Sequence, residues 1–435
     1  MRDRSAMPMS QWFLSSLSVP NWLFGLLLTT FPALLGLILG PIISVRSDRH
    51  RSPRGRRIPF LLWTTPIAAA GMIGIGLTPL IAGWLHGLGD SSSALGAWLH
   101  QAAGTEGIGA RLLTLLENKM VVSVVCFGVF WAIFEFAAIA SQSVFGGLIN
   151  DVVPPELIGR FYGMFRAVSL LDGIIFNFWV MGIVPTHFTL ILVIIGVLYG
   201  VGFYWVCLRV KEGAYPPPPP VASGGRVAEV KSYFRDSFHR PYYVAVFLLL
   251  TLGNLCFLPI NAFSIPYANS LGMSMDSYGK CLAITYTISL CLAYLIGWLA
   301  DRFHPLRVSM AALALYGVTS AAGFILARDT QSFSLFFIIH GVASGCYFTG
   351  VASLGQRLFP RSKFAQFASA SGILGSVGSI AVGPLAGAVI DLSGGVYRYT
   401  FGLGALLAAV AFVCAWAVYV QFRRLGGPSA YTAPE

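Results

Sequence analysis

Long apolar segments separated by short polar ones run through most of this sequence, from Asn21 to Phe422. A helix needs roughly 20 residues to cross a hydrocarbon layer about 30 Å thick, and these segments have that length. Helices are expected in them because unpaired backbone N–H and C=O groups are too costly in lipid. We therefore predict eleven spanning helices, at residues 20–45, 59–84, 120–147, 161–183, 188–209, 241–266, 278–300, 307–327, 333–356, 366–390 and 398–422.

Composition indicates the same class. Of the 435 residues, 56% are hydrophobic and 10% are charged, whereas soluble domains carry about 25% charged residues. The 48 glycines and 24 prolines also fit, because small residues let membrane helices approach closely and prolines are tolerated there. The predicted fold class is an all-α membrane protein, and a soluble enzyme is excluded.

Basic residues gather on one side of the predicted spans. Six arginines lie between residues 46 and 57, and more Lys and Arg residues follow the fifth, seventh, ninth and last spans. Cytoplasmic loops are rich in Lys and Arg. We therefore place these loops and the C-terminus in the cytoplasm, and the chain in the cytoplasmic (inner) membrane. Topology thus explains the net charge of +11, and no nucleic-acid partner is expected.

A polar stretch with five consecutive prolines, residues 216–220, separates the fifth and sixth spans. Such a run favours a stiff polyproline II segment, which we interpret as a spacer. The predicted organisation is a first bundle of five spans at 1–209, a cytoplasmic linker at 210–240, a second bundle of six spans at 241–422 and a cytoplasmic tail at 423–435.

The two bundles share sequence features. A loop with an Asp-Arg pair occurs in each bundle: Ser47, Asp48, Arg49 and Arg56 in the first half, and Gly297, Asp301, Arg302 and Arg307 in the second. A Pro-x₄-Gly/Ala-x-Phe spacing also occurs in each: Pro154, Gly159 and Phe161 in the first half, and Pro360, Ala365 and Phe367 in the second. Two pseudo-symmetric bundles of six helices, as in transporters built from parallel repeats, are the architecture that this implies.

One helix is missing from that pattern. The Asp-Arg loop of the second half follows two predicted spans, whereas that of the first half follows one, and the run from Trp12 to Val19 is too short to span. We expect that the true start of the protein lies upstream of Met1. The alternative is a genuine chain of eleven spans.

Motifs of soluble catalysis are not found in the sequence. The seven cysteines lie in apolar segments, and none forms a CxxC or a Cys/His cluster spaced for a metal. There is no Gly-rich phosphate loop followed by Lys and Ser or Thr, and no Ser/His/Asp arrangement. We expect no enzymatic activity, no bound metal and no cofactor.

The loop from Ser47 to Phe60 reads SDRHRSPRGRRIPF. It resembles the S-D-R-x-x-S-x-x-G-R-R-x-P-F loop of the sucrose:proton symporters, within the glycoside-pentoside-hexuronide:cation symporter group of the major facilitator superfamily. A weaker likeness continues through Gln142, Leu148 and Asp151 and from Phe161 to Gly173. Together these likenesses cover about the first 175 residues. The second half of the chain matches only the general facilitator pattern.

This resemblance implies a major facilitator fold of twelve helices, a sugar as substrate and protons as the coupling ion. Glu135 stands where the family has a membrane-embedded aspartate in its fourth helix. Gly146 stands where the family has an arginine, so that contact is not carried over, and Ser44 replaces a glycine that is usual before the S-D-R.

Three ionisable residues lie within predicted spans of the first half: Glu135, Arg166 and Asp172. Such residues are costly in lipid and are candidates for function. Glu135 and Asp172 are expected at similar depth, where two neighbouring carboxylates cannot both ionise easily, so one would hold a transferable proton. The alternative is that one of them forms a static ion pair with Arg166. We assign all three to proton coupling.

Polar and aromatic residues at helical spacing are candidates for solute binding. In the second half Asn254 and Asn261 lie seven residues apart, and His340, Ser344 and Tyr347 form an i, i+4, i+7 stripe. Amides and rings suit sugar hydroxyls and pyranose faces, although such stripes also serve as contacts between helices. The predicted substrate-binding residues are Trp131, Gln142, Asn254, Asn261, His340 and Tyr347.

The Asp-Arg loops lie too far from the middle of the membrane to bind solute. We expect Asp48, Arg49, Arg56, Asp301 and Arg302 to form gating salt bridges, because alternating access is largely a rocking of the two halves. Arg51, Arg54 and Arg57 are interpreted as charges that only set topology. In the helix at 366–390, a series of glycines around Pro384 is interpreted as a surface for close packing.

The function predicted from the sequence is secondary active transport by alternating access, with proton-coupled symport of a sugar or glycoside as the specific expectation. A proton-driven exporter of amphipathic molecules is the first alternative, since fold alone does not settle function. A membrane sensor or remnant that does not transport is the second. The expected partners are a small solute and the lipid bilayer, and no obligatory protein partner is expected.

Overall fold

The computed structural model describes residues 2–90, 92–103, 107–154, 157–213, 215, 233–360 and 364–434. All regular elements in these ranges are helices, as the sequence predicts. Most of the expected linker, residues 214 and 216–232, lies outside the described residues.

Ten helical segments among the described residues are long and apolar enough to cross a membrane. One of them, Phe161–Arg209, contains 49 residues and covers two predicted spans. At 1.5 Å per residue it would be about 74 Å long, which is more than twice the hydrocarbon thickness. It is not one straight helix, because a π-helical turn, a 3₁₀ turn and a non-helical residue at His187 interrupt it. The prediction of many spans is therefore confirmed, with one boundary drawn differently.

By their internal contacts the described residues form two units. Unit 1 comprises residues 1–19, 38–163 and 183–218, and unit 2 comprises residues 20–37, 164–182 and 219–435. Unit 2 combines the two halves of the sequence, because residues 20–37 and 164–182 pack with helices of the second half.

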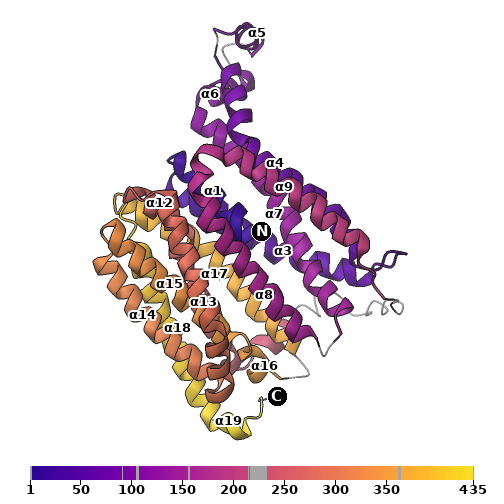
Figure 1. The fold of residues 1–435 in the computed structure, drawn as a ribbon, viewed down its shortest axis with the longest axis vertical. Coiled ribbons are helices and arrows are strands. Elements are labelled where there is room, and N and C mark those ends of the chain that lie inside the picture. The colour runs from indigo at the N-terminus through magenta and orange to yellow at the C-terminus, as the bar shows by residue number, and fades with distance from the viewer. Residues whose placement is uncertain are drawn as a thin grey trace. The chain divides into compact units, whose positions relative to one another are not determined.

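The centre of unit 1 is the group of α4, α7 and α9, which lie side by side in Figure 1. Ile58, Leu61 and Val144 belong to a buried cluster between them. The short helix α1 also packs here, since the Phe13 ring stacks on Phe188 with 5.1 Å between centroids. The elements of unit 1 are η1 (Arg2–Ala6), α1 (Met7–Ser16), α3 (Phe31–Arg49, from residue 38), α4 (Ile58–Leu88), α5 (Ala94–Ala103), α6 (Ile108–Glu117), α7 (Lys119–Val152) and α9 (Val184–Arg209).

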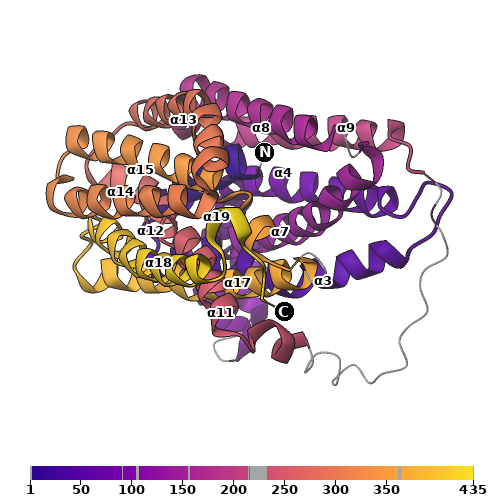
Figure 2. The same cartoon turned by 90° about the horizontal axis from the view of Figure 1, so that it is seen from below.

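Unit 2 has its core between α11, α14, α15, α17 and α18, and Figure 2 shows α14 and α15 beside each other. Its elements from the first half of the sequence are α2 (Asn21–Gly25), η2 (Leu26–Thr30), α8 (Ile158–Ile175, from residue 164) and η3 (Phe176–Val180), followed by the 3₁₀ turn η4 (Met181–Ile183) at the boundary. Those from the second half are α11 (Pro241–Leu255), α12 (Leu258–Ser270), α13 (Met275–Phe303), α14 (Pro305–Leu326), α15 (Thr330–Val351), α16 (Leu354–Leu358), α17 (Phe364–Leu392), α18 (Tyr399–Arg424) and α19 (Gly427–Ala430).

Helix α2 is held against α17 by a carboxylate. Asp391 accepts hydrogen bonds from the backbone N–H groups of Asn21 and Trp22, at 3.1 and 2.9 Å, and from the Asn21 side chain at 2.7 Å. A negative charge is unfavourable at the C-terminal end of its own helix, and the N-terminus of α2 compensates for it. The contact therefore depends on both helices.

Candidate functional site

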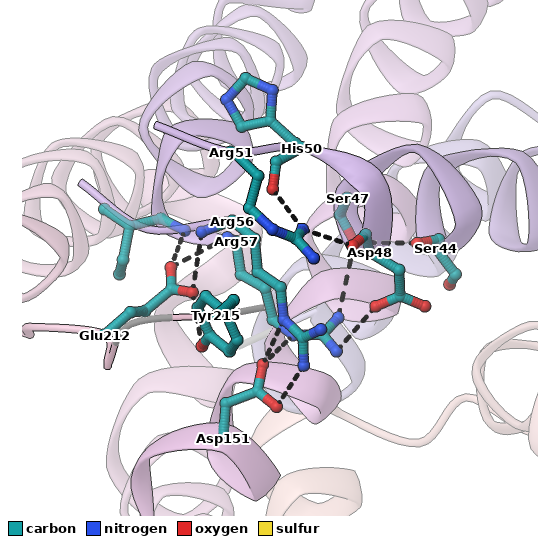
Figure 3. A network of polar contacts seen from close by, with 11 residues as sticks. Ser44, Ser47, Asp48, His50, Arg51, Arg56, Arg57, Asp151, Glu212 and Tyr215 are labelled. Atoms are coloured by element: carbon teal, nitrogen blue, oxygen red, sulfur yellow. Dashed lines mark hydrogen bonds and ion pairs between the residues drawn. The ribbon is translucent and has the colours of Figure 1, made fainter. Parts of the chain in front are cut away.

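The polar loop between α3 and α4 forms a network of ion pairs in unit 1, which we call the arginine-loop network (Figure 3). Arg56 binds Asp151 of α7 with both its Nε and Nη2 atoms, at 3.1 and 2.6 Å. Arg57 binds the same carboxylate and also Asp48 at the end of α3, at 2.9 Å. The network thus ties together α3, the loop and α7.

Glu212, just after α9, extends this network to the N-terminus of α4. Its carboxylate accepts hydrogen bonds from the backbone N–H groups of Arg56, Arg57 and Ile58, at 3.0, 2.9 and 2.6 Å. These N–H groups have no partner within a helix, and the positive end of the helix dipole favours an anion there. Glu212 therefore serves as a cap for α4 that comes from a distant part of the chain.

Tyr215 completes the network. Its hydroxyl donates to Glu212 at 2.8 Å, and its ring lies 4.1 Å from the guanidinium carbon of Arg56. Burial and the hydrogen bond to Glu212 raise the pKa of Tyr215. The hydrogen bond to Asp151 raises the pKa of Arg56. Both groups therefore keep their protons around neutral pH and can act as donors to the two carboxylates.

Gly147 makes room for this arrangement on α7. A Cβ atom at this position would lie 2.3 Å from the guanidinium group of Arg57. Gly147 is one turn before Asp151 on the same helix face, so the arginine passes over the glycine to reach the carboxylate.

The structure brings two of the predicted gating residues of this loop into the network and leaves one out. Asp48 and Arg56 are members, whereas Arg49 is exposed and has no hydrogen-bond or ion-pair partner among the described residues. The interpretation of Arg57 as a charge that only sets topology is wrong, because this side chain is buried and binds two carboxylates. A gating role for the set stays a prediction.

Unit 2 contains a corresponding pair with reversed charges. Asp301, at the end of α13, binds Arg357 of α16 at 2.8 Å. Arg357 lies three residues before Pro360, as Asp151 lies three residues before Pro154. Arg302, predicted to form gating salt bridges, instead places its guanidinium group 5.5 Å from the centre of the Trp298 ring.

The candidate proton-coupling residues differ in their surroundings. Glu135 on α7 is completely buried, and so is Trp131 one turn earlier, which stacks on Phe127 at 5.6 Å. Asp172 and Arg166, both on α8, are exposed, and Arg166 donates to Thr349 at 3.2 Å. Because Glu135 belongs to unit 1 and Asp172 to unit 2, a shared proton between them stays a prediction.

A polar cluster around the buried His340 in unit 2 contains two of the predicted substrate-binding residues. His340 of α15 is 2% exposed, and its Nε2 atom lies 3.0 Å from Oδ1 of Asn261. Its Nδ1 atom lies 3.1 Å from the hydroxyl of Tyr316, which in turn donates to the backbone carbonyl of Cys256. That carbonyl lies at the break between α11 and α12.

Other predicted substrate-binding residues lie around or apart from this cluster. Tyr347 is buried against Phe257, with 5.6 Å between ring centroids, and is not exposed to a solute. Asn254 and Asn261 are both exposed, although they belong to Pro241–Ser270, the most buried of the ten candidate spans. Gln142 is exposed on α7.

Sequence reasoning did not identify Glu212, Tyr215 or Arg357 as members of a site. Glu212 and Tyr215 follow the last apolar residues of α9 and bind a loop about 155 positions earlier, a pairing that no local pattern encodes. Arg357 was counted only as a topological charge. In the described residues, no group of three His, Cys, Asp or Glu side chains is arranged to hold a metal ion.

Comparison with known proteins bears on the class of the protein. Residues 256–430 match the Major Facilitator Superfamily. The MFS transporter asaE of Aspergillus flavus is 24% identical over 284 residues, which are 64% of this chain and 56% of that protein. The chain thus spans little more than half the length of this curated relative.

Two solved structures show the same fold. The inward-facing, unoccupied bacterial homologue of the human lysosomal transporter Spinster has a TM-score of 0.67 at 14% identity, over 100% of this chain and 95% of that chain. The inward-facing bacterial homologue of the iron transporter ferroportin has a TM-score of 0.57 at 15% identity, over 96% and 98%. The chain is a multi-pass membrane protein with the major facilitator fold. The family match over residues 256–430 and the curated relative support membership of that superfamily.

Proposed function

We propose that this chain is a secondary active transporter that moves a small hydroxylated solute, a sugar or glycoside, together with protons. The observation that carries the proposal is Glu135, a carboxyl group with no exposed surface in the middle of an apolar helix of 34 residues. A charge there is costly, so the residue is expected to take up and release a proton as its surroundings change.

The polar surface of α11 and α12 supports a hydrophilic solute. Asn254 and Asn261 are exposed polar groups in the interior of an otherwise largely buried span, and His340 behind Asn261 fixes the orientation of its amide. An amide in lipid would be unfavourable, whereas in a water-filled pathway it can both donate to and accept from solute hydroxyl groups.

Aromatic side chains give a specific reason for a second candidate, a proton-driven exporter of amphipathic molecules. Phe348 is only partly buried, and its ring lies 5.5 Å from that of the buried Phe257. An accessible ring backed by a second one suits an apolar moiety as well as the face of a sugar.

The test is uptake into proteoliposomes with an imposed pH gradient, using labelled sucrose, maltose and simple glucosides. We expect accumulation that is abolished by a proton uncoupler and by Glu135→Gln, and preserved in Glu117→Gln, a change to an exposed carboxylate outside the spans. Solute exchange without a gradient should survive in Glu135→Gln, because exchange needs binding but no net proton movement.

Two results would contradict the sugar symporter. If no sugar accumulates while a hydrophobic dye is driven against the proton gradient, the exporter is the function. If Glu135→Gln abolishes exchange as well as accumulation, while the purified variant remains monodisperse, the residue supports binding or structure and not coupling.

A further inference from the structure

Two arginines beside the arginine-loop network, Arg46 and Arg49, have no side-chain partner among the described residues. The described acidic residues at this end of unit 1 are all engaged: Asp48 and Asp151 with Arg57, and Glu212 with the N-terminus of α4. Arg46 and Arg49, on the last turn of α3, are exposed and have no hydrogen-bond or ion-pair partner among the described residues. The end of α3 therefore carries an uncompensated positive charge.

An apolar stripe on α3 leads to these two arginines. Ile38, Ile42 and Val45 are 50%, 45% and 55% exposed. They follow the spacing i, i+4, i+7, so they share one helix face, and Arg49 continues the stripe at i+11. From residue 38 to residue 49 the helix rises about 16 Å, which is about half of the hydrocarbon thickness. The stripe together with the arginine turn thus has about the depth of a single leaflet.

We propose that this face of α3 is a binding site for an anionic phospholipid. The phosphate lies between Arg46 and Arg49, and an acyl chain lies along Ile38, Ile42 and Val45. Guanidinium groups bind phosphate oxygens with two parallel hydrogen bonds, and a basic group at a helix end attracts anionic lipid. A soluble anion would use the arginines but would gain nothing from the exposed stripe.

The site adjoins the arginine-loop network. Asp48 lies between Arg46 and Arg49 on the same turn, and its carboxylate binds Arg57. A lipid phosphate at this turn neutralises the two free arginines, which would otherwise compete with Arg57 for Asp48. The lipid is therefore expected to strengthen the Asp48–Arg57 pair and to stabilise unit 1.

The experiment is lipid binding by the purified full chain in detergent, measured by native mass spectrometry and by the thermal unfolding midpoint. The probes are dioleoylphosphatidylglycerol, dioleoylphosphatidylcholine and glycerol phosphate. We expect retention of phosphatidylglycerol over phosphatidylcholine, with a higher midpoint. In the Arg46→Gln/Arg49→Gln variant the affinity for phosphatidylglycerol should fall by roughly tenfold or more.

Two further variants make the result decisive. Arg111→Gln/Arg328→Gln removes two exposed arginines elsewhere in the chain and should bind phosphatidylglycerol like the wild type. Arg46→Lys/Arg49→Lys keeps the charge and should retain most of the preference, which keeps the test valid if the glutamine variant folds poorly. The proposal is overturned if Arg46→Gln/Arg49→Gln keeps the preference for phosphatidylglycerol. It is also overturned if Arg111→Gln/Arg328→Gln and Arg46→Lys/Arg49→Lys both lose this preference to the same extent as the Arg46→Gln/Arg49→Gln variant, or if glycerol phosphate raises the unfolding midpoint as much as the lipid does.

Discussion

Arg57 and Asp151 are joined across the loop between α3 and α4 by an ion pair in which both side chains are nearly buried, with 10% and 13% of their surface exposed. Asp151 also binds Arg56, and Arg57 also binds Asp48. Two arginines and two carboxylates thus balance each other in a small space. Removal of one member leaves the remaining charges unequal in number in this partly buried space.

The first prediction concerns this pair. Arg57→Gln and Asp151→Asn should each lower the free energy of unfolding by about 3 kcal/mol, because each breaks a nearly buried ion pair and leaves an excess of one charge among the remaining members. The double variant should lose much less than the sum of the two. Thermal unfolding of the four proteins in one detergent measures this coupling. Arg54→Gln, at an exposed position of the same loop, is the control and should leave the midpoint unchanged. Additive losses would mean that the pair does not act as a unit.

The second prediction concerns the contact between η2 and α17. A Cβ atom at Gly383 would overlap the Oγ1 atom of Thr29, so any larger side chain must separate the two helices. Because η2 and α17 come from different halves of the chain, the secondary transport that we propose, by a rocking of the two halves, requires this contact to open. Gly383→Trp should therefore hold the protein in the state with this contact open and should abolish uptake.

Labelling of Thr29→Cys with a maleimide measures that opening, since Thr29 is 6% exposed. The rate should rise several-fold in the Gly383→Trp background. Gly375→Trp is the matched control on the same helix, because a Cβ there meets nothing within 4 Å. Equal labelling in both backgrounds would argue against a contact that opens at Gly383.

The third prediction concerns His304, between α13 and α14. Its ring packs on Phe422 at 4.6 Å, its Nδ1 atom accepts the N–H of Leu306, and its backbone has a left-handed φ of 78°. Burial, with Arg357 and Arg307 nearby, lowers the pKa of His304 to about 4. The unfolded chain therefore binds a proton near pH 6.5 that the folded protein does not, so stability falls as the pH drops from 6.5 toward 4.

His304→Asn should reduce this loss, because asparagine tolerates a left-handed backbone and can accept the same hydrogen bond. The difference between the two proteins should reach at most about 3 kcal/mol at pH 4. Unfolding midpoints at pH 7.0, 5.5 and 4.5 give the comparison. His239→Asn, at an exposed position, should keep the slope of the wild type. An unchanged slope in His304→Asn would remove His304 as its cause.

The sequence predicts the helices and spans well because length and apolarity are local properties. It also identifies Asp48 and Arg56, which belong to a recognisable loop. It does not predict the cap that Glu212 provides for α4, since the two lie in segments about 155 residues apart. The sequence does not predict the reversed pair Asp301–Arg357 for a similar reason. Arg357 is one of many arginines in the basic loops, and it can be distinguished from them only when its partner is known.

The helices α5 and α6 illustrate another limit. They lie between two predicted spans, in a stretch too polar and too short to read as membrane helices. The structure ties α6 to α4 through the His86 ring and the backbone carbonyl of Leu116, 2.8 Å apart. Such short helices depend on tertiary contacts more than on local propensity, and the sequence pattern therefore leaves them undefined.

The most direct test of a proton-coupled transporter is the movement of protons caused by the solute itself. Proteoliposomes containing a pH-sensitive dye and no imposed gradient receive the sugar that the wild type accumulates. The account predicts acidification of the interior with the wild-type protein and with Glu117→Gln, and none with Glu135→Gln although exchange of the sugar continues. Sugar entry into wild-type vesicles without any change in internal pH, or equal acidification with Glu135→Gln, would contradict it.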